Sequence, residues 1–313
     1  MKIVVLDANT LGNDIHLDEF PLLRDAEIFP ATKPEEVSER VSDCDVIILN
    51  KVKLSEKNLS GAKNLKLICI TATGYDNVDV EYCKKRGIAV CNVVGYSTDS
   101  VAQVTVATAL SLWMHLSYFE RYVRDGRYTA SGVQNCLSPT FSELSGKTWG
   151  IVGYGNIGKK VGEIAKAIGC RVIYTRRSED QNAVLLDTLF MESDVISVHT
   201  PLNEQTRHLI GKEELAKMKP GAILVNAARG AVLDEEAVCE AILNETIAGF
   251  GTDVYSAEPI PAGHPFEKLY HSDRVLFTPH MAWGAYEARK RCIEEIEENI
   301  RVYFAGEKRN RVV

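Results

Sequence analysis

An arginine, a glutamate and a histidine each follow a short apolar run in the second half of the chain. Arg229 comes after residues 222–226, Glu258 after residues 248–252 and His280 after residues 275–278. Such runs, separated by segments of helical length, predict parallel strands. Ligands of an open α/β sheet bind beyond the carboxyl ends of its strands, so the three side chains can converge there.

These side chains suit the reduction of a 2-keto acid, which needs a hydride, a proton and a hold on the carboxylate. Arg229 can bind the carboxylate and polarise the ketone with its planar set of donors. His280 can donate the proton near neutral pH, while Glu258 can orient the imidazole ring and favour its protonated form. The His, Cys, Asp and Glu residues show no metal-ligand spacing, so we expect no metal.

A glycine-rich turn predicts the place of a dinucleotide. Gly153, Gly155 and Gly158 form a Gly-x-Gly-x-x-Gly between the apolar run 149–152 and the helical stretch 159–168. The first glycine permits a tight turn, the second lets the backbone approach a pyrophosphate, and the third lets helix and strand pack closely. The amino-terminal end of the helix adds a partial positive charge.

The next strand, residues 171–175, ends without the carboxylate that would bind an adenine ribose and select NAD. Thr175 stands there, followed by Arg176 and Arg177, whose guanidinium groups suit a 2′-phosphate. We therefore expect an NAD(P) cofactor with a preference for NADP(H). The alternative is a solvated basic loop that Glu179 and Asp180 partly neutralise.

Two sets of predicted elements must position these residues, and both predict parallel sheets covered by helices. Residues 3–6, 45–49, 65–70 and 88–91 form the first set of strands, and residues 149–152, 171–175, 194–198, 222–226, 248–252 and 275–278 form the second. A stretch from Ser100 to about Tyr122 is apolar on most faces, so we expect one buried helix, with an equal chance of a share in a dimer contact. Residues 234–243 predict a helix capped by Asp234, and residues 284–304 a helix with one apolar stripe.

Together these motifs make the chain resemble the D-isomer-specific 2-hydroxyacid dehydrogenase family over nearly its whole length. The resemblance includes the Thr73-Gly74-Tyr75-Asp76-Asn77-Val78-Asp79 loop, the glycine-rich turn, and His199-Thr200-Pro201-Leu202 with Thr206. It implies an α/β protein with two doubly wound parallel-sheet domains, a Rossmann cofactor domain and a flavodoxin-like substrate domain, with the active site in the cleft. It also implies a homodimer through the cofactor domain.

The resemblance assigns roles to further residues. Asp253 would bind the nicotinamide carboxamide, the backbone of Thr73 and Gly74 would bind the substrate carboxylate, and His199 is interpreted as structural or near the cofactor. The expected cofactor-binding residues are Gly153, Gly155, Asn156, Ile157, Gly158, Thr175, Arg176, Arg177, Thr200, Pro201, Thr206, Ala227, Ala228 and Asp253. The expected substrate-binding residues are Lys51, Thr73, Gly74, Arg229 and Trp283.

Three short segments resemble the glycerate dehydrogenase/hydroxypyruvate reductase branch of that family. They are Leu6-Asp7-Ala8-Asn9-Thr10-Leu11-Gly12, Asn50-Lys51-Val52 and Met281-Ala282-Trp283. Lys51 and Trp283 at the rim of a pocket would suit hydroxypyruvate or glyoxylate, unless Lys51 is solvated and Trp283 only packs. The alternatives are a dehydrogenase of the same fold for D-lactate or for aryl or branched keto acids, and a non-catalytic NAD(P)-sensing scaffold.

Composition narrows the class of protein. The 313 residues carry a net charge of −7 with no basic patch, which argues against nucleic-acid binding. No run of 18 apolar residues predicts a membrane span. The eight cysteines form no Cys-x-x-Cys pair, so free thiols in a reducing cytoplasm are expected. The motif order predicts a discontinuous substrate domain, residues 1–98 and 285–313, around a cofactor domain of residues 99–284.

Overall fold

The computed structural model describes residues 1–177 and 180–313. These residues form two compact units, Met1–Ser97 with Gly284–Val313, and Thr98–Trp283. Thr98 thus belongs to the second unit and Gly284 to the first. Each of the two domain boundaries lies one residue before the position expected from the sequence. Thr98 is the first residue of a long helix, and it therefore groups with the unit in which that helix packs.

The first unit, all of it described, contains one parallel sheet with the strand order β2-β1-β3-β4-β5. The order is that of flavodoxin-like folds, and the chain reverses direction across the sheet between β1 and β3. The strands are β1 (Ile3–Val5), β2 (Glu27–Ile28), β3 (Val46–Leu49), β4 (Leu67–Ile70) and β5 (Ala89–Cys91). The sequence does not predict β2, because this strand has only two residues, Glu27 and Ile28, which are too few to show a pattern.

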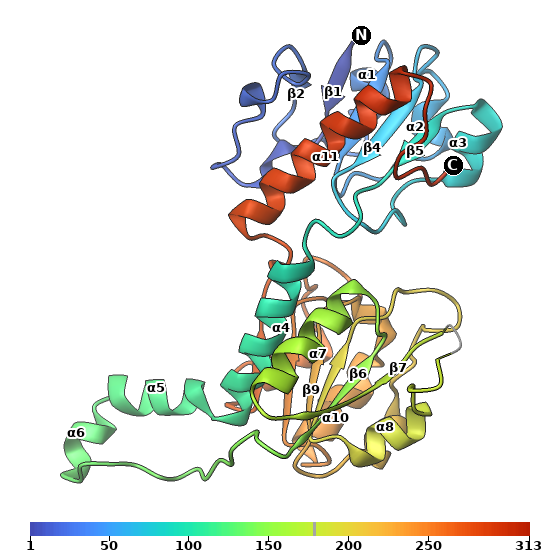
Figure 1. Cartoon of the computed structure of the whole chain (residues 1–313). Coiled ribbons are helices and arrows are strands. Elements are labelled where there is room, and N and C mark those ends of the chain that lie inside the picture. The colour runs from blue at the N-terminus through green and yellow to red at the C-terminus, as the bar shows by residue number, and fades with distance from the viewer. Residues whose placement is uncertain (178–179) are drawn as a thin grey trace. The chain divides into compact units, whose positions relative to one another are not determined.

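Helices cover both faces of this sheet, as its fully buried apolar strands require. They are α1 (Val37–Arg40), α2 (Glu56–Leu59), α3 (Val80–Arg86) and α11 (Tyr286–Phe304), with the 3₁₀ turns η1 (Ala8–Leu11) and η2 (Leu17–Glu19). The apolar stripe of α11, including Cys292, Ile296 and Ile300, is buried, and this helix packs over β4 (Figure 1). The last helix of the sequence therefore completes the core of the first unit.

The described part of the second unit forms a parallel sheet with the order β11-β10-β9-β8-β6-β7. The strands are β6 (Thr148–Val152), β7 (Arg171–Thr175), β8 (Val195–Val198), β9 (Ile223–Asn226), β10 (Gly249–Thr252) and β11 (Val275–Phe277). From β6 the chain proceeds to β7 on one side and then returns to β8 on the other. The glycine-rich turn thus follows the strand at which the order reverses, where such sheets bind ligands.

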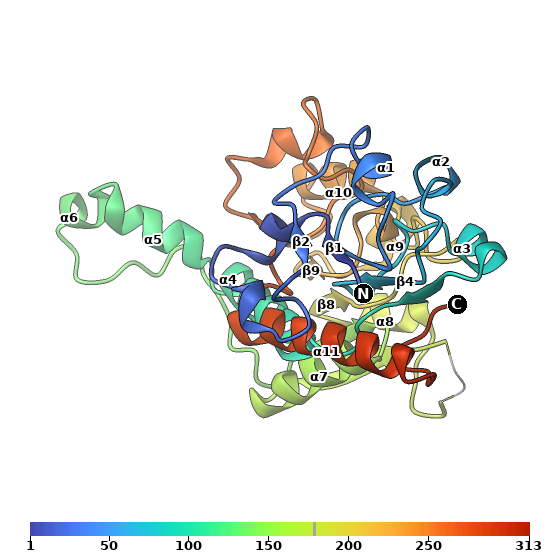
Figure 2. The same ribbon diagram turned by 90° about the horizontal axis from the view of Figure 1, so that it is seen from above.

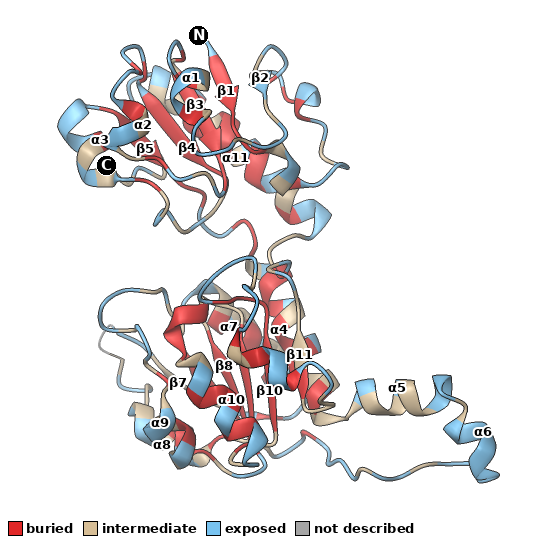
Figure 3. Ribbon diagram, turned by 180° about the vertical axis from the view of Figure 1, so that it is seen from behind, coloured by how far each residue is buried: buried red, intermediate tan, exposed pale blue. Residues whose placement is uncertain are grey.

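Two apolar clusters lie on the two faces of this sheet. In β9, Ile223 and Val225 join the cluster formed with α4 and α7, whereas Leu224 joins the one formed with α8, α9 and α10. This alternation is the period of two that a strand buried on both faces must show. The strands β6, β8, β9 and β10 are buried along their whole length, as Figure 3 shows for β8 and β10. The helices and turns are α4 (Thr98–Trp113), α7 (Asn156–Ala167), α8 (Leu186–Glu192), α9 (Lys212–Lys217), α10 (Glu235–Leu243), η3 (Gly230–Val232) and η4 (Pro265–Leu269).

The expectation of one buried helix from Ser100 to Tyr122 is wrong in its second half. α4 ends at Trp113, His115 takes a left-handed backbone conformation with φ of 53°, and a separate helix α5 (Leu116–Arg124) follows. Neither α5 nor α6 (Arg127–Ser131), both fully described, has a buried residue. Both helices extend away from the sheet of their unit (Figures 1 and 2). Among the described residues, no helix is both long and apolar enough to cross a bilayer.

Candidate active site

His280 and Glu258 form a tight pair in the second unit. The Nδ1 atom of His280 lies 2.6 Å from Oε2 of Glu258, and both side chains are less than one-third exposed. An ionised carboxylate only accepts hydrogen bonds, so Nδ1 carries its proton and donates it to Glu258. The ring then exchanges its other proton through Nε2. Glu258 is itself held, because its Oε1 accepts the backbone N–H of Tyr255 at 3.0 Å.

Asp253 anchors the loop that carries His280. Its Oδ1 accepts the hydroxyl of Thr278 at 2.7 Å and the N–H of Met281 at 2.8 Å, and its Oδ2 accepts the N–H of Ala282 at 2.8 Å. Asp253 is buried, so these bonds are shielded from water. They flank His280, whose φ of 53° is uncommon for a residue with a side chain. Asp253 therefore stabilises a strained backbone at His280.

Arg229 stands at the start of η3, on a turn that Asn226 closes. The side-chain amide of buried Asn226 donates to the carbonyl of Arg229 at 2.9 Å and accepts the N–H of Ala228 at 3.0 Å. One guanidinium nitrogen of Arg229 donates to the carbonyl of Ala228 at 2.8 Å, and Ala227 completes the turn. The sequence predicts no role for Asn226, although its position at the end of β9 is a signal.

A close backbone contact joins the turn of Arg229 to the loop of Glu258. A Cβ atom placed on Gly230 would lie 2.0 Å from the carbonyl carbon of Tyr255 and 2.2 Å from the nitrogen of Ser256. Since β9, β10 and β11 are neighbours, Arg229, Glu258 and His280 all follow strand ends at one edge of the sheet. The structure thus brings the three predicted catalytic residues to one side of this unit.

The glycine-rich turn borders a cavity of about 280 Å³. Its lining includes five residues predicted to bind the cofactor, Gly153, Thr175, Arg176, Arg177 and Thr200, together with the apolar side chains of Val184, Leu185, Leu186 and Leu209. A Cβ atom on Gly155 would meet nothing within 4 Å, so the space above this glycine is open. An open glycine at a helix start beside a partly apolar cavity fits the pyrophosphate and adenosine of a dinucleotide.

His199 supplies a second observation that fits a bound dinucleotide. Both of its ring nitrogens are buried, and neither has a hydrogen-bond partner among residues 1–177 and 180–313. Burial lowers the pKa of His199 to about 3, so the ring is neutral at physiological pH. Its backbone contacts the turn, because a Cβ on Gly153 would lie 2.8 Å from the carbonyl carbon of His199. Nearby, the Thr206 hydroxyl donates to the carbonyl of Pro201 at 2.6 Å.

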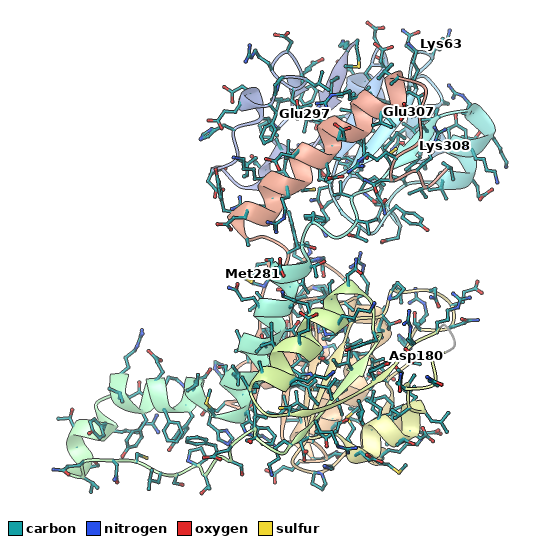
Figure 4. The ribbon with its side chains drawn as sticks, viewed as in Figure 1. Lys63, Asp180, Met281, Glu297, Glu307 and Lys308 are labelled. Atoms are coloured by element: carbon teal, nitrogen blue, oxygen red, sulfur yellow. The ribbon has the colours of Figure 1, made fainter. Side chains whose placement is uncertain are left out.

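The end of β7 carries a network that the sequence predicts only in part. Asp180, which is labelled in Figure 4, accepts the hydroxyl of Tyr174 at 3.0 Å and a guanidinium N–H of Arg176 at 3.4 Å. The N–H of Asn182 and these two side chains hold the pKa of Asp180 below its usual value. The ring of Tyr174 stacks on that of Tyr154 with a centroid distance of 3.8 Å. The predicted neutralisation by Glu179 lies outside the described residues.

In the first unit, buried Asp7 organises the loop that carries Lys51. The carboxylate accepts the backbone N–H groups of Asn50, Lys51 and Val52, at 2.6 Å for Lys51. Burial raises the pKa of Asp7, and the three N–H donors oppose that rise. The side-chain amide of Asn77 donates to the carbonyls of Asn50 and Val52 at 3.0 Å each. The sequence predicts no such role for Asp7 or Asn77, although Asp7 follows the first strand.

Asn77 belongs to the same loop as Thr73 and Gly74, so the structure ties the two predicted substrate-binding loops of the first unit together. The Thr73 hydroxyl donates to the carbonyl of Val93 at 2.8 Å, which fixes the start of that loop. Trp283 lies in the second unit, where its indole N–H donates to the carbonyl of His280 at 3.1 Å.

A dinucleotide-type fold with an acid–base pair and an arginine at its strand ends defines a nicotinamide-dependent oxidoreductase. The chain matches the family model of the D-isomer specific 2-hydroxyacid dehydrogenase, NAD binding domain, over residues 106–282. It belongs to this family.

Named relatives are similar to this chain over almost its whole length. The chain is 33% identical to a hydroxypyruvate reductase from Blautia hydrogenotrophica, over 98% of each chain. It is 34% identical to a glycerate dehydrogenase from Methylorubrum extorquens, covering 99% of this chain and 98% of the relative. Among solved structures, an acyclic imino acid reductase in complex with NADPH and D-Arg covers all of both chains at 28% identity, with a TM-score of 0.88.

Proposed function

We propose that this protein reduces a small 2-keto acid, hydroxypyruvate or glyoxylate, to the corresponding D-2-hydroxy acid. The observation that carries the proposal is the 2.6 Å contact between His280 and Glu258, on the same sheet edge as Arg229. The substrate class is supported by the names of the similar proteins, a hydroxypyruvate reductase and a glycerate dehydrogenase.

The residues divide the chemistry between them. Arg229 holds the substrate carboxylate and polarises the ketone oxygen, on which negative charge develops. His280, oriented through Nδ1 by Glu258, gives its Nε2 proton to that oxygen. In the opposite direction the neutral ring takes the proton back. When bound, the reduced nicotinamide supplies the hydride.

Residues of both units supply the remaining substrate contacts in this proposal. The backbone of Thr73 and Gly74 in the first unit binds the substrate carboxylate, and Lys51 of the first unit with Trp283 of the second favours a small polar substituent. The bonds of Asp7 and Asn77 support the assignment in the first unit, since Asp7 holds the loop of Lys51 and Asn77 fixes this loop to the loop of Thr73.

Absorbance at 340 nm tests the function directly. We expect turnover of hydroxypyruvate and glyoxylate to exceed that of pyruvate and of aryl or branched keto acids. A best substrate that is bulky would contradict the proposed substrate class. Tight cofactor binding with no turnover of any keto acid would instead indicate a sensing scaffold.

The cofactor site favours NADP(H) in our proposal. Gly153, Gly155, Asn156, Ile157 and Gly158 hold the pyrophosphate, while Arg176 and Arg177 bind the 2′-phosphate at the end of β7. The position of both arginines in the lining of the cavity supports this preference. Comparison of kcat/KM for NADPH and NADH tests it, and a strong preference for NADH would contradict it.

A second copy of this chain is the proposed partner, bound through the cofactor unit. The arm formed by α5, α6 and the following residues exposes Leu116, Val123, Val133, Leu137 and Phe141, each more than 45% accessible. Apolar surface of this extent, with aromatic rings and arginines beside it, is typical of an interface. A cavity of about 450 Å³ at the root of the arm, lined by Ser111, Leu116, Ser117, Glu120 and Arg121, could receive part of the second copy.

Light scattering after size exclusion tests the dimer. The wild-type protein should elute as a dimer, and a Val123→Asp, Leu137→Asp double variant should elute as a monomer. Met191→Asp is the control, because Met191 is about as exposed as Val123 but lies on α8, outside the arm. A monomeric wild type would contradict the proposal. We also propose a cytoplasmic location, which the eight free thiols, seven of them buried, favour.

A further inference from the structure

A buried acid–imidazole pair lies beside the loop of Glu258, and no motif pointed to it. Nε2 of His264 lies 3.1 Å from Oε2 of Glu235, and the two side chains are 5% and 10% exposed. Nδ1 of His264 accepts the backbone N–H of Phe266 at 3.3 Å. The proton of a neutral imidazole must therefore be on Nε2, where it is donated to Glu235. Both ring nitrogens are thus engaged.

Glu235 uses the same carboxylate to hold Ser256. Its Oε1 accepts the backbone N–H of Ser256 at 2.9 Å, and its Oε2 accepts the Ser256 hydroxyl. Glu235 is the first residue of α10, where the helix dipole favours a negative charge. The carboxylate of Glu235, at the start of α10, thus accepts three hydrogen bonds, two of which come from Ser256. These two bonds hold Ser256 in the loop.

The anchored point is two residues from Glu258. Between residues 255 and 258, the N–H of Tyr255 donates to Glu258. The backbone of Tyr255 and Ser256 packs directly against Gly230, the residue after Arg229. A shift of Ser256 therefore moves both the carboxylate that orients His280 and the turn that carries Arg229.

We propose that Glu235 and His264 are positioning residues, which hold Ser256 so that Glu258 meets the ring of His280. The inference rests on the proposed roles of Glu258 and His280. Glu235 and His264 do not touch the reacting atoms, and their effect passes through the Tyr255–Glu258 loop. A misplacement of about 1 Å in such a site can cost roughly 100-fold in rate.

Kinetics of matched variants tests the proposal. Glu235→Gln replaces one acceptor by a donor, and His264→Leu removes the donor to Glu235. Each should lower kcat roughly 10- to 100-fold with the KM for the cofactor unchanged, since the cofactor cavity is built from other residues. His264→Gln keeps an N–H at the same reach and should restore most of kcat. Glu236→Gln, exposed on the same helix turn, should match the wild type.

The Nδ1 proton signal of His280 in an NMR spectrum gives a readout that needs no turnover. In Glu235→Gln this signal should move upfield, because Glu258 no longer lies at hydrogen-bond distance from Nδ1. It should stay in place in Glu236→Gln. An unchanged signal and kcat with only a lower Tm would overturn the proposal. Failure of the proposed function would appear differently, as a wild type without turnover of any keto acid.

Discussion

Oε2 of Glu258 lies 2.6 Å from Nδ1 of His280, while the other oxygen of the same carboxylate accepts the N–H of Tyr255. The carboxylate is thus fixed at both oxygens before it orients the ring. Asp253 fixes the backbone that follows His280, because it accepts the N–H groups of Met281 and Ala282. The ring of His280 and the backbone beside it are thus held by two carboxylates, both on the segment following β10.

We expect Glu258→Gln to change the pH dependence of reduction. Glutamine can still accept the Nδ1 proton, but it removes the negative charge that favours the protonated ring. Reduction needs that protonated ring, so the loss of activity on the alkaline side should begin at lower pH than in the wild type. The pH profile of kcat/KM measures this shift. A profile identical to that of the wild type would show that the charge of Glu258 is not used.

Arg229→Lys and His280→Ala should separate substrate binding from proton transfer. Lysine keeps the charge of Arg229 but loses the planar pair of donors, so kcat/KM should drop by about 10²–10³. Loss of the general acid in His280→Ala should lower kcat by about 10²–10⁴.

Cofactor binding, followed by fluorescence of the reduced nicotinamide, should survive in both variants, since neither residue lines the cofactor cavity. Full activity in either variant would contradict the proposed mechanism.

Gly230→Ala should damage both stability and activity. The added Cβ would lie 2.0 Å from a backbone atom of Tyr255, so the loop of Glu258 or the turn of Arg229 must move. Overpacking of this kind costs about 1–3 kcal/mol of unfolding free energy. Gly221→Ala is the matched control, because a Cβ there meets nothing within 4 Å. Equal Tm values for the two variants would show that the loop of Glu258 and the turn of Arg229 can move apart without loss of stability.

Much of this site could be predicted because its residues follow strand ends. Short β-branched runs mark the strands, and residues just after them must lie at one sheet edge, as found for Arg229, Glu258 and His280. The roles of these residues in catalysis stay predictions. The cap of α10 could also be predicted, because Asp234 is a typical capping residue just before a helical stretch. The structure confirms it: Asp234 accepts the N–H groups of Glu236 and Ala237 at 3.1 Å each.

The remaining features depend on contacts between residues far apart in the sequence. Glu235 and His264 are 29 residues apart, and Asp7 is 43 residues from Asn50, so no local pattern connects either pair. The break at His115 has no glycine or proline to mark it. Apolar residues that bind a second copy of the chain give the same sequence pattern as residues buried within one chain. An exposed arm can therefore be mistaken for a buried helix.

Asp180→Asn should raise the preference for NADPH. The Asp180 carboxylate competes with a 2′-phosphate for Arg176, and the amide removes that charge. The gain in kcat/KM for NADPH should reach about fivefold, within the range of an exposed ion pair, with NADH little affected. Asp187→Asn removes a carboxylate that pairs with Lys217 on another element, and it should change kcat/KM for neither cofactor. A fall in kcat/KM for NADH would instead indicate that Asp180 binds the ribose.

The acid stability of the first unit should depend on Asp14, which pairs with Arg289 of α11. A guanidinium N–H of Arg289 donates to Asp14 Oδ2 at 2.7 Å, and this hydrogen bonding lowers the pKa of Asp14 to about 2. A carboxylate with a lowered pKa in the folded state contributes its stabilisation above pH 4, and the contribution is lost as the pH falls toward 2. Asp14→Asn should therefore lower the free energy of unfolding at pH 7 but not at pH 2, as measured by urea denaturation.

Glu35→Gln, an exposed change in the same unit, is the control, and its difference from the wild type should not change between pH 7 and pH 2. A constant difference between Asp14→Asn and the wild type from pH 7 to pH 2 would show that the ion pair is not the cause.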